Sequence, residues 1–162
     1  MSNREEQVVL VNEEDQVLDL MGKQEAHEKG LLHRAISIIV FNSKGNMLVQ
    51  QRSDAKYHWA GIWSNTVCTH PRNDESYADA AQRRLFEELG FNTPLTEQFS
   101  FIYKATDEQS GKYDGPIPFN KDEVKAVKWM STEELETQLK AHPEQFSFWF
   151  KIILKEMKAR NL

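Results

Sequence analysis

Two β-branched runs joined by a glycine-containing turn limit what this chain can fold into more than any other feature. Residues 34–41 read RAISIIVF and residues 47–52 read MLVQQR, with SKGN between them. β-Branched residues favour strands, and a short turn with glycine joins antiparallel neighbours. A second pair of apolar runs, QVVLV and QVLDLM, is divided by a short acidic stretch and predicts another hairpin. The chain is therefore predicted to begin with two hairpins.

Later segments predict further strands and several helices. IWSNTVC, FSFIYKA and VKAVKWM have the composition of strands. Apolar residues fall near helical spacing from Ser76 to Leu89, and Gly90 is a favourable stop. Ser131 can cap a helix, with Glu134 reaching back. The last segment carries an apolar helix stripe at positions 146, 149, 150, 153, 154 and 157. This order predicts an α+β fold, a mixed sheet covered by helices on both faces.

Length and composition predict one domain over residues 1–162. The chain can build one core, and no repeat or linker divides it. Hydrophobic residues make up 40% and charged residues 28%, as in globular proteins, and the net charge of −5 argues against broad nucleic-acid binding. The longest apolar run is too short to span a bilayer, the N-terminus lacks a signal-peptide core, and a single cysteine fits a reducing compartment. We expect a cytoplasmic protein without nucleic-acid or membrane partners.

One predicted helix carries paired charges. Arg83 stands four residues before Glu87 and Arg84 four residues before Glu88, with Glu75 just ahead of the helix. Exposed pairs at this spacing contribute only about 0.2–0.5 kcal/mol each, so surface ion pairs are a sufficient interpretation of the pattern alone. The alternative is a carboxylate face for a divalent cation, because Mg²⁺ is often shared between a carboxylate and substrate phosphates.

Cys68, the single cysteine, stands two positions before His70. A thiol that titrates near neutrality can exchange protons with a substrate, whereas a free cysteine is most often a small buried hydrophobe. His27, His33 and His70 are candidate ligands for Zn²⁺ or Mn²⁺, although their spacing matches no short-range metal motif. The residues by themselves leave both interpretations open. The other two histidines, His58 and His142, are expected to be structural or on the surface.

The charged helix resembles the Nudix box, which binds metal–diphosphate substrates. The matching positions are Glu75, Arg83, Leu85, Glu87, Glu88 and Gly90. Thr69 stands where the usual hydrolase box has its leading glycine, and Arg84 stands where it has a glutamate after the arginine. That glutamate helps to hold the hydrolytic metal, whereas an arginine would grip a phosphate. The box therefore favours diphosphate binding over diphosphate hydrolysis.

Four segments in order extend the resemblance to nearly the whole chain. They read KQEAHEKGLLHRAIS, QQRSDAKYHWAGIWSNTVCTHP, RRLFEELG and FIYKATD. Together they are similar to the type 1 isopentenyl-diphosphate Δ-isomerases, from about residue 7 to the C-terminal helix. The resemblance implies a Nudix-type α/β/α sandwich. It also implies interconversion of isopentenyl diphosphate and dimethylallyl diphosphate, by adding a proton at one end of an allylic system and removing another.

The resemblance further implies roles for individual residues. Cys68 and Tyr103 would serve proton transfer, and the ring of Trp149 would steady a cationic intermediate. The expected diphosphate contacts are Lys23, Arg52, Lys56 and Arg84. The expected metal ligands are His27, His33 and His70 for Mn²⁺ or Zn²⁺, and Glu88 for a Mg²⁺ that accompanies the diphosphate. Each residue also has an ordinary interpretation, as core aromatic or solvated surface charge.

One part of the family pattern is missing. The first metal site of the family also uses two glutamates in an E-x-E pattern on the strand after the tyrosine, and one of them is a catalytic acid/base. After FIYKATDEQSG this chain continues KYDGPIPFNKDEV, so one strand with its turn is predicted to be absent near residues 111–112. The natural chain carries the segment and this sequence omits it, or the protein is an impaired relative, or Asp107, Glu108 or Asp114 substitutes. Adjacent residues of a strand point apart, and loss of an inner strand would leave edge groups unpaired, which favours the first explanation.

Two rival functions remain open at this point. One is a Nudix diphosphohydrolase, against which Arg84 argues. The other is a catalytically impaired relative that still binds diphosphates. In every case the expected partner is a small diphosphate, and the expected assembly is a monomer or a homodimer.

Overall fold

The chain forms a mixed sheet with helices on both sides. A computed structural model describes residues 6–56, 59–102 and 106–162. Its elements are β1 (Gln7–Val11), β2 (Val17–Gly22), α1 (Lys23–Glu28), β3 (Ala35–Phe41), β4 (Met47–Arg52), β5 (Trp63–Ser64), β6 (Val67–Thr69), α2 (Tyr77–Leu89), β7 (Leu95–Phe101), β8 (Thr106–Lys112), β9 (Val124–Met130), α3 (Thr132–Ala141), a 3₁₀ turn η1 (Pro143–Gln145) and α4 (Phe148–Ala159).

The main sheet has seven strands of mixed direction. Its path runs β5-β4-β3-β8-β7, with β6 paired to β3 and β9 paired to β4. Only the β3–β8 pair is parallel among the pairs described, and the others are antiparallel. β1 and β2 form a separate antiparallel hairpin. Both hairpins expected from the sequence are therefore confirmed, since β3 and β4 also pair antiparallel.

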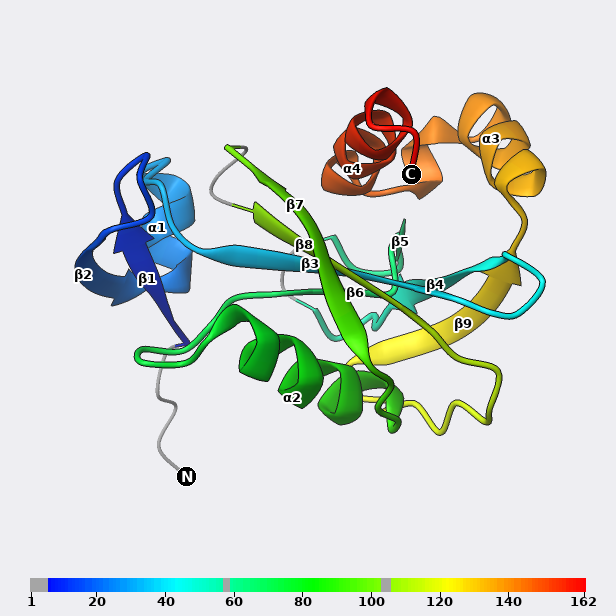
Figure 1. Ribbon diagram of the computed structural model, residues 1–162, viewed down its shortest axis with the longest axis horizontal. Helices are drawn as coiled ribbons and strands as arrows, with labels where there is room; N and C mark the ends of the chain where they lie inside the picture. The colour runs from blue at the N-terminus through cyan, green and yellow to red at the C-terminus, as the bar shows by residue number, and fades with distance from the viewer. Residues whose placement is uncertain (1–5, 57–58, 103–105) are drawn as a thin grey trace.

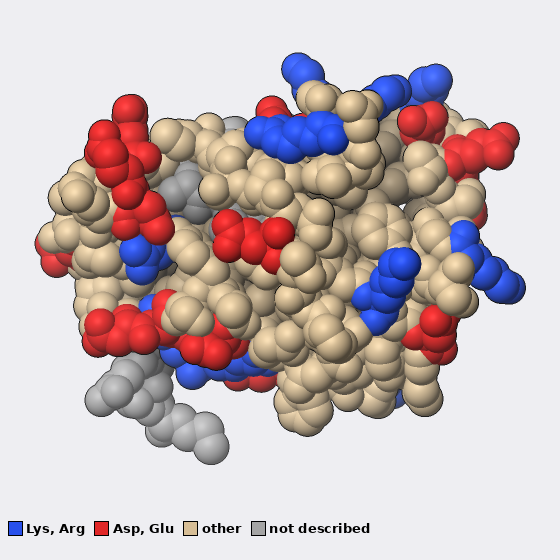
Figure 2. All heavy atoms as spheres, in the orientation of Figure 1, with Lys and Arg blue, Asp and Glu red and all other residues tan. Residues whose placement is uncertain are grey.

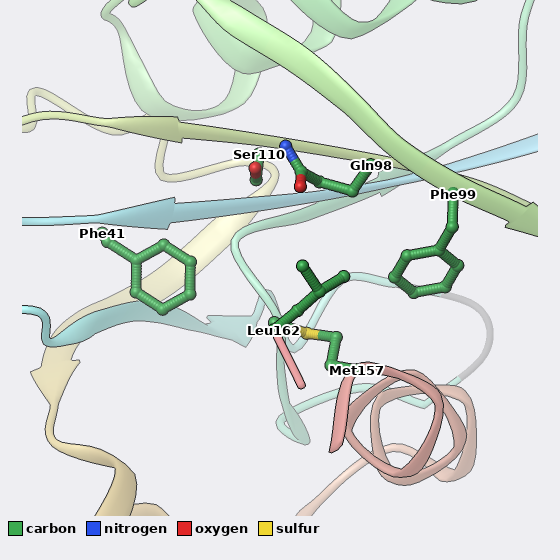
Figure 3. A pocket seen from close by; sticks show the side chains of 6 residues that line it. All are labelled: Phe41, Gln98, Phe99, Ser110, Met157 and Leu162. Atoms are coloured by element: carbon green, nitrogen blue, oxygen red, sulfur yellow. The ribbon is translucent and has the colours of Figure 1, made fainter. Parts of the chain in front are cut away.

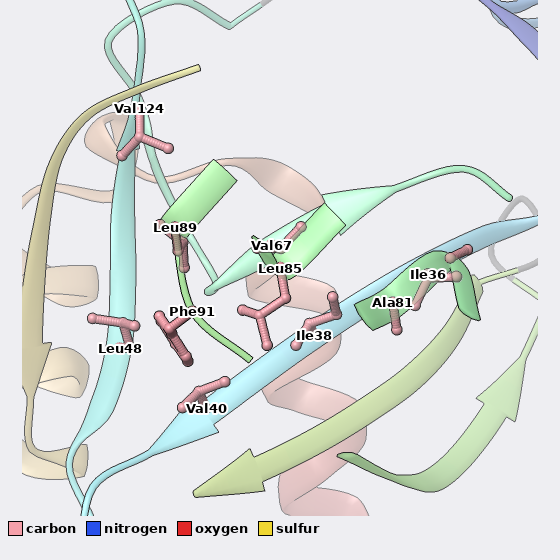
Figure 4. Packing of buried hydrophobic residues seen from close by; sticks show 11 residues of the cluster. Ile36, Ile38, Val40, Leu48, Val67, Ala81, Leu85, Leu89, Phe91 and Val124 are labelled. Atoms are coloured by element: carbon pink, nitrogen blue, oxygen red, sulfur yellow. The ribbon is translucent and has the colours of Figure 1, made fainter. Parts of the chain in front are cut away.

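Alternation along β3 divides the core into two layers. Ile36, Ile38 and Val40 pack in one cluster with Leu85 of α2, whereas Ile39 packs in a second cluster with residues of α4. Because successive strand residues point to opposite faces, one strand feeds both layers. Figure 4 shows the first cluster, and Figure 1 shows α2 on one side of the sheet and α3 and α4 on the other. The expected α+β fold with covered faces is confirmed.

The helix α2 begins and ends where the sequence predicts. Ser76 caps it, because its hydroxyl accepts a hydrogen bond from the Asp79 amide. Gly90 ends it in the left-handed conformation, with φ of 74°. A Cβ at Gly90 would collide with the carbonyl oxygen of Pro118, so glycine is required there for space as well as for backbone conformation. These two ends fix the position of the charged face of α2.

The segment IWSNTVC forms two short strands, and the single strand expected from its composition is wrong. β5 pairs with β4 and β6 pairs with β3, so the chain crosses from one strand to the other at Asn65 and Thr66. The Thr66 hydroxyl accepts from the Val40 amide and donates to the Leu48 carbonyl. Side chains thus replace the interrupted backbone ladder, and buried polar side chains at the crossing are a signal that strand composition does not reveal.

The sheet also differs from expectation beyond β7. Residues 106–112 form β8, which lies between β3 and β7. Residues of this chain therefore pair along this edge of β3, and the loss of a strand segment near residues 111–112 stays a prediction.

The surface carries both signs of charge. In the view of Figure 2, Asp and Glu side chains gather at the end near β1, β2 and α1, and Lys and Arg side chains lie along the edge formed by α4. Among the described residues, no helix is both long and apolar enough to cross a bilayer.

A small apolar cavity lies between the sheet and α4. Its volume is about 150 Å³, and Figure 3 shows its lining by Phe41, Gln98, Phe99, Ser110, Met157 and Leu162. None of the residues with a predicted catalytic or binding role lines it, so the candidate site must be sought elsewhere on the fold.

Candidate active site

Three histidines far apart in the sequence meet at one end of the sheet. His27 lies in α1, His33 forms a bridge with Leu10 just before β3, and His70 follows β6. Their potential ligand atoms all lie within 4.8 Å of one another. No other group of three or more potential ligand residues meets this criterion in the described parts of the chain. The structure therefore brings together the three histidines proposed as one metal site.

The histidine group has the donor chemistry of a metal site. His33 Nδ1 lies 2.7 Å from the Leu31 carbonyl oxygen. This contact favours the tautomer with the proton on Nδ1, which leaves the lone pair of Nε2 available for a metal ion. His70 is partly exposed as a residue, yet its Nδ1 is buried and has no hydrogen-bond partner. Burial, with the positive charge of Lys23 and the other two histidines, holds the pKa of His70 well below its usual value. Neutral imidazoles of this kind fit a divalent ion such as Zn²⁺ or Mn²⁺.

Cys68 lies on β6 beside the polar side chains of Ser37 and Asn65. Its Cα pairs with that of Ser37 on β3, and the Cys68 sulfur lies 3.6 Å from the Ser37 hydroxyl oxygen. The thiol donates to Oδ1 of Asn65 at 3.0 Å. Cys68 is only half-buried, so the interpretation as an inert core residue does not describe its surroundings. Because it stands two residues before His70 at the end of the same strand, the thiol and the histidine group belong to one region.

Trp149 reaches the same region from α4. Its indole Nε1 donates to the Ser64 hydroxyl at 2.9 Å, and the Arg52 guanidinium carbon lies 5.6 Å from the ring centroid. Trp59 approaches the ring edge-on, with the centroids 6.0 Å apart. The ring also packs against the core cluster below α4. Core packing is therefore confirmed for this tryptophan, and its role toward a cation stays a prediction.

The charged face of α2 is a partly buried ion-pair network, in which Glu88 is the buried member. Arg84 donates to Glu88 at 2.5 Å, to Glu87 at 2.8 Å and to Glu123 at 3.3 Å. Gln50 also donates to Glu88, at 2.9 Å. The pKa of Arg84 is raised, because the carboxylates outweigh the burial that opposes its charge. Burial raises the pKa of Glu88, but with a guanidinium nitrogen at 2.5 Å we take it as ionised at neutral pH. Surface ion pairs worth a few tenths of a kcal/mol do not describe this network.

The two lysines proposed to bind the diphosphate, Lys56 and Lys23, lie in different parts of the structure. Lys56 forms an ion pair with Glu123, the same carboxylate that Arg84 contacts. Lys23 begins α1 and pairs with Glu6 at 3.0 Å on the surface. The sequence did not identify Glu123 and Gln50 as members of this network. The loop before β9 and the strand β4, which carry them, meet α2 only in the folded chain. Glu88 is not part of the histidine group in the described structure.

Two predicted features fall where the side chains are not described. Tyr103 lies outside the described residues. Within β8, the Cα of Glu108 is in register with that of Ser37, and that of Asp107 is in register with that of Ile36. The structure therefore places the backbone of Glu108 one strand away from the Ser37–Cys68 pair.

Comparisons with known proteins identify the family. The NUDIX domain family matches residues 31–150. A relative from Aromatoleum aromaticum named isopentenyl-diphosphate Delta-isomerase 2 is 43% identical over 90% of this chain and 82% of its own length. A relative of the same name from Photorhabdus laumondii is 39% identical over 98% of this chain and 96% of its own. The chain belongs to the isopentenyl-diphosphate Δ-isomerase family.

Solved structures agree with the isomerase family in fold. DR0079 from Deinococcus radiodurans superposes with a TM-score of 0.76 at 21% identity, covering 85% of this chain and 90% of that one. A MutT protein from Methanosarcina mazei superposes with a TM-score of 0.65 at 20% identity, covering 78% and 93%. At these identities the comparison establishes the Nudix fold and nothing further.

The isomerase relatives also carry residues that this chain lacks. The alignment with the Photorhabdus relative runs over 169 residues, which is longer than the whole chain of 162 residues. Residues of that relative are therefore without a counterpart here.

Proposed function

We propose that this protein interconverts isopentenyl diphosphate and dimethylallyl diphosphate. The observation that carries the proposal is the placement of Cys68. Its thiol lies beside Ser37 and Asn65 at the end of β6, two residues before a histidine of the candidate metal group. Hydrogen bonds through Asn65 and Ser64 connect the thiol to the indole of Trp149. A group able to exchange a proton and a ring able to face a cation thus share one site.

The chain supplies residue types suited to each stage of this isomerisation. A proton is added to the terminal carbon of the substrate double bond, and the neighbouring carbon becomes a tertiary cation. A proton is then removed from the carbon on the diphosphate side, so the double bond moves by one position. Cys68 serves one of these transfers, assisted by Tyr103, and the other needs a carboxylate, the role of the family's E-x-E glutamates, for which Glu108 of β8 is the candidate in this chain. The face of Trp149 stabilises the positive charge between the two transfers. Water is kept from the cation by the aromatic rings of Trp59 and Trp149.

Two divalent ions fit the donor sets of this chain. His27, His33 and His70 would hold Zn²⁺ or Mn²⁺, and Glu88 would help to hold a Mg²⁺ bound to the diphosphate. When bound, such ions would neutralise substrate charge and lower the proton affinity of neighbouring groups. Lys23, Arg52, Lys56 and Arg84 would bind the diphosphate oxygens. Arg84 and Lys56 would then exchange contacts with Glu123 for contacts with the substrate.

The described ion-pair network argues against the diphosphohydrolase alternative. Glu87, Glu88 and Glu123 all contact Arg84, which stands where the hydrolase box has a glutamate. The guanidinium compensates part of their charge, so these side chains alone would bind a divalent ion weakly, and the Mg²⁺ assigned to Glu88 would be held mainly by the diphosphate. An isomerase has no need of that metal, because no phosphorus–oxygen bond is broken in its reaction.

A product assay separates the three candidate functions. Purified protein is incubated with isopentenyl diphosphate, Mg²⁺ and Mn²⁺, and the substrate methylene signal is followed by NMR while released phosphate is measured in parallel. We expect dimethylallyl diphosphate without phosphate release. Release of phosphate or a monophosphate would establish the hydrolase instead. Tight binding with neither product would identify an impaired diphosphate-binding relative.

We also propose the domain organisation, the location and the assembly state of the protein. We place the function in one domain over residues 1–162, from which one strand segment of the family has been lost near residues 111–112. The intact mass of the natural protein tests the loss, because an unshortened chain would exceed 18.9 kDa by about a dozen residues. A cytoplasmic location, and a monomeric or homodimeric state, are tested by fractionation and by light scattering.

A further inference from the structure

Asn65 is a fully buried polar residue at the crossing between β5 and β6. Its exposed fraction is 0%. Its Nδ2 donates to the carbonyl oxygens of Ile38, at 3.1 Å, and Val67, at 2.9 Å. Both amide hydrogens are therefore used by backbone acceptors. The reverse orientation would set the amide oxygen against two carbonyl oxygens, so the direction of the Asn65 side chain is fixed by the backbone.

The amide oxygen of Asn65 consequently faces the candidate active site. It accepts one hydrogen bond from the Cys68 thiol at 3.0 Å and another from the Ser64 hydroxyl at 3.0 Å. These two donors match the two lone pairs of an amide oxygen. The thiol hydrogen is thus directed by an acceptor that the backbone itself holds in place.

Ser64 extends this contact to the opposite layer of the fold. Its hydroxyl is buried, accepts from Trp149 Nε1 at 2.9 Å and lies 3.1 Å from the hydroxyl of Ser147, which caps α4. A continuous chain of hydrogen bonds, buried at Asn65 and Ser64, therefore runs from Cys68 on β6 to Trp149 on α4. Buried networks of this kind are strong when every member is satisfied.

We propose that Asn65 is a positioning residue that orients the Cys68 thiol and, through Ser64, the indole of Trp149, so that the proton-transfer group and the ring move as one unit. The inference rests on the proposed isomerase function. Neither Asn65 nor Ser64 touches the reacting atoms in this assignment; both act through Cys68 and Trp149. Small displacements of reacting groups lower rates strongly, roughly 100-fold for 1 Å, which gives such positioning its value.

Thr66 provides a matched control for a purely structural role. It is the next residue in the chain, is equally buried, and also binds neighbouring strands through its side chain. Its hydroxyl bonds go to the backbones of Val40 and Leu48 and not to Cys68 or Trp149. Thr66→Val therefore removes a buried structural hydroxyl without interrupting the proposed chain.

The first measurement is independent of activity. Because Cys68 is the single cysteine, the infrared S–H stretching band of the protein reports the hydrogen bonding of one thiol. We expect Asn65→Ala to move this band to the higher frequency of a weakly bonded thiol, and Thr66→Val to leave it in place. An unchanged band in folded Asn65→Ala would overturn the proposed contact.

The second measurement uses steady-state kinetics with isopentenyl diphosphate. We expect Asn65→Ala and Ser64→Ala to lower kcat by roughly 10- to 100-fold with little change in KM, because they displace reacting groups without removing diphosphate contacts. Ser64→Thr, which keeps the hydroxyl, should recover most of the loss, and folded Thr66→Val should retain the parent kcat.

The two measurements separate the possible failures. If the parent protein produces no dimethylallyl diphosphate, the proposed function fails, while the infrared comparison still decides whether Asn65 orients Cys68. If Asn65→Ala does not fold, the two Ser64 variants test the proposal in its place. A kcat equal to that of the parent in folded Ser64→Ala would reject the coupling to Trp149. A loss of kcat equal to that of Thr66→Val would show that both residues are only structural.

Discussion

Arg84 and Glu88 form an ion pair one turn apart on α2, with 2.5 Å between guanidinium nitrogen and carboxylate oxygen. The Glu88 side chain is only 7% exposed. A charge buried to this degree needs a partner, and Arg84 supplies it from the helix position where a hydrolase box has a glutamate. The pair therefore links the stability of α2 to the choice between binding and hydrolysing a diphosphate.

Arg84→Gln tests this double role. We expect a loss of about 3 kcal/mol in the free energy of unfolding, because the variant leaves Glu88 buried without its cation. We also expect the KM for isopentenyl diphosphate to rise at least tenfold, because a charge-assisted phosphate contact is lost. Thermal unfolding and steady-state kinetics measure the two effects. Arg83→Gln is the matched control, and equal KM values in the two variants would refute the assigned role of Arg84.

Cys68→Ala tests the proton-transfer assignment. We expect kcat to fall by about 10²–10⁴-fold, the usual contribution of a positioned acid/base, while the melting temperature changes little because the thiol is only half-buried. Cys68→Ser replaces the thiol with a hydroxyl of similar size. This variant should also be strongly impaired, since a hydroxyl is far less acidic than a thiol. Turnover of Cys68→Ala near the parent rate would show that the thiol is not the group that transfers the proton.

His70→Ala tests the histidine metal site. We expect the variant to lose one tightly bound divalent ion per chain, because one of three ligands is removed and the buried Nδ1 with it. Metal content after dialysis, measured by mass spectrometry, gives the stoichiometry. His142→Ala removes an exposed histidine that pairs with Glu144 and should leave the content unchanged. Equal metal content in His70→Ala and the parent would contradict the site.

Glu75 makes stability depend on pH. Arg83 donates to both carboxylate oxygens, at 2.6 and 2.9 Å, and this contact lowers the pKa of Glu75 below its usual 4.5. A lowered pKa means that the stabilisation is complete above pH 4.5 and is lost as pH falls through the folded-state value. We expect Glu75→Gln to be less stable by about 1–3 kcal/mol at pH 7. The difference in melting temperature should vanish in acid, and a constant difference at every pH would contradict the assignment.

Glu108 and Asp107 pair with different residues of β3, so we expect their substitutions to change the activity unequally. The Cα of Glu108 is level with Ser37, whose hydroxyl contacts Cys68, whereas the Cα of Asp107 is level with Ile36 of the core. If β8 supplies an acid in place of the missing glutamates, we expect Glu108→Gln to lower kcat by about 100-fold or more and Asp107→Asn to have little effect. Steady-state rates of the two variants decide, and parental activity in both would exclude β8 as the source.

Local patterns in the sequence were sufficient for much of the fold. The turn at 43–46, the cap at Ser131 and the stop at Gly90 lie where short-range chemistry predicts them. The crossing at Asn65 and Thr66 escaped prediction, because those side chains bond to strands distant in the sequence. β8 escaped as well, since TDEQSGK lacks the β-branched and aromatic composition of a central strand.

The candidate site was predictable through family resemblance more than through spacing. His27, His33 and His70 come from a helix, a strand edge and a strand end, and only the topology of the sheet places them within 4.8 Å. Glu123 joins Arg84 from a loop 39 residues away, a distance at which no helical or strand periodicity operates. Residue types suggested the chemistry, while the long-range contacts that tune it had to be observed.

The parallel pairing of β3 with β8 has a consequence for synthesis of the protein. Paired positions such as Ala35 and Thr106 are about seventy residues apart in the chain. At roughly 5–20 residues per second, β3 waits on the order of 4–14 s on the ribosome before its parallel neighbour is made. During that interval one edge of an Ile- and Val-rich strand has no partner from its own chain. Chaperone dependence and aggregation of nascent chains should therefore be greatest for products that end before β8.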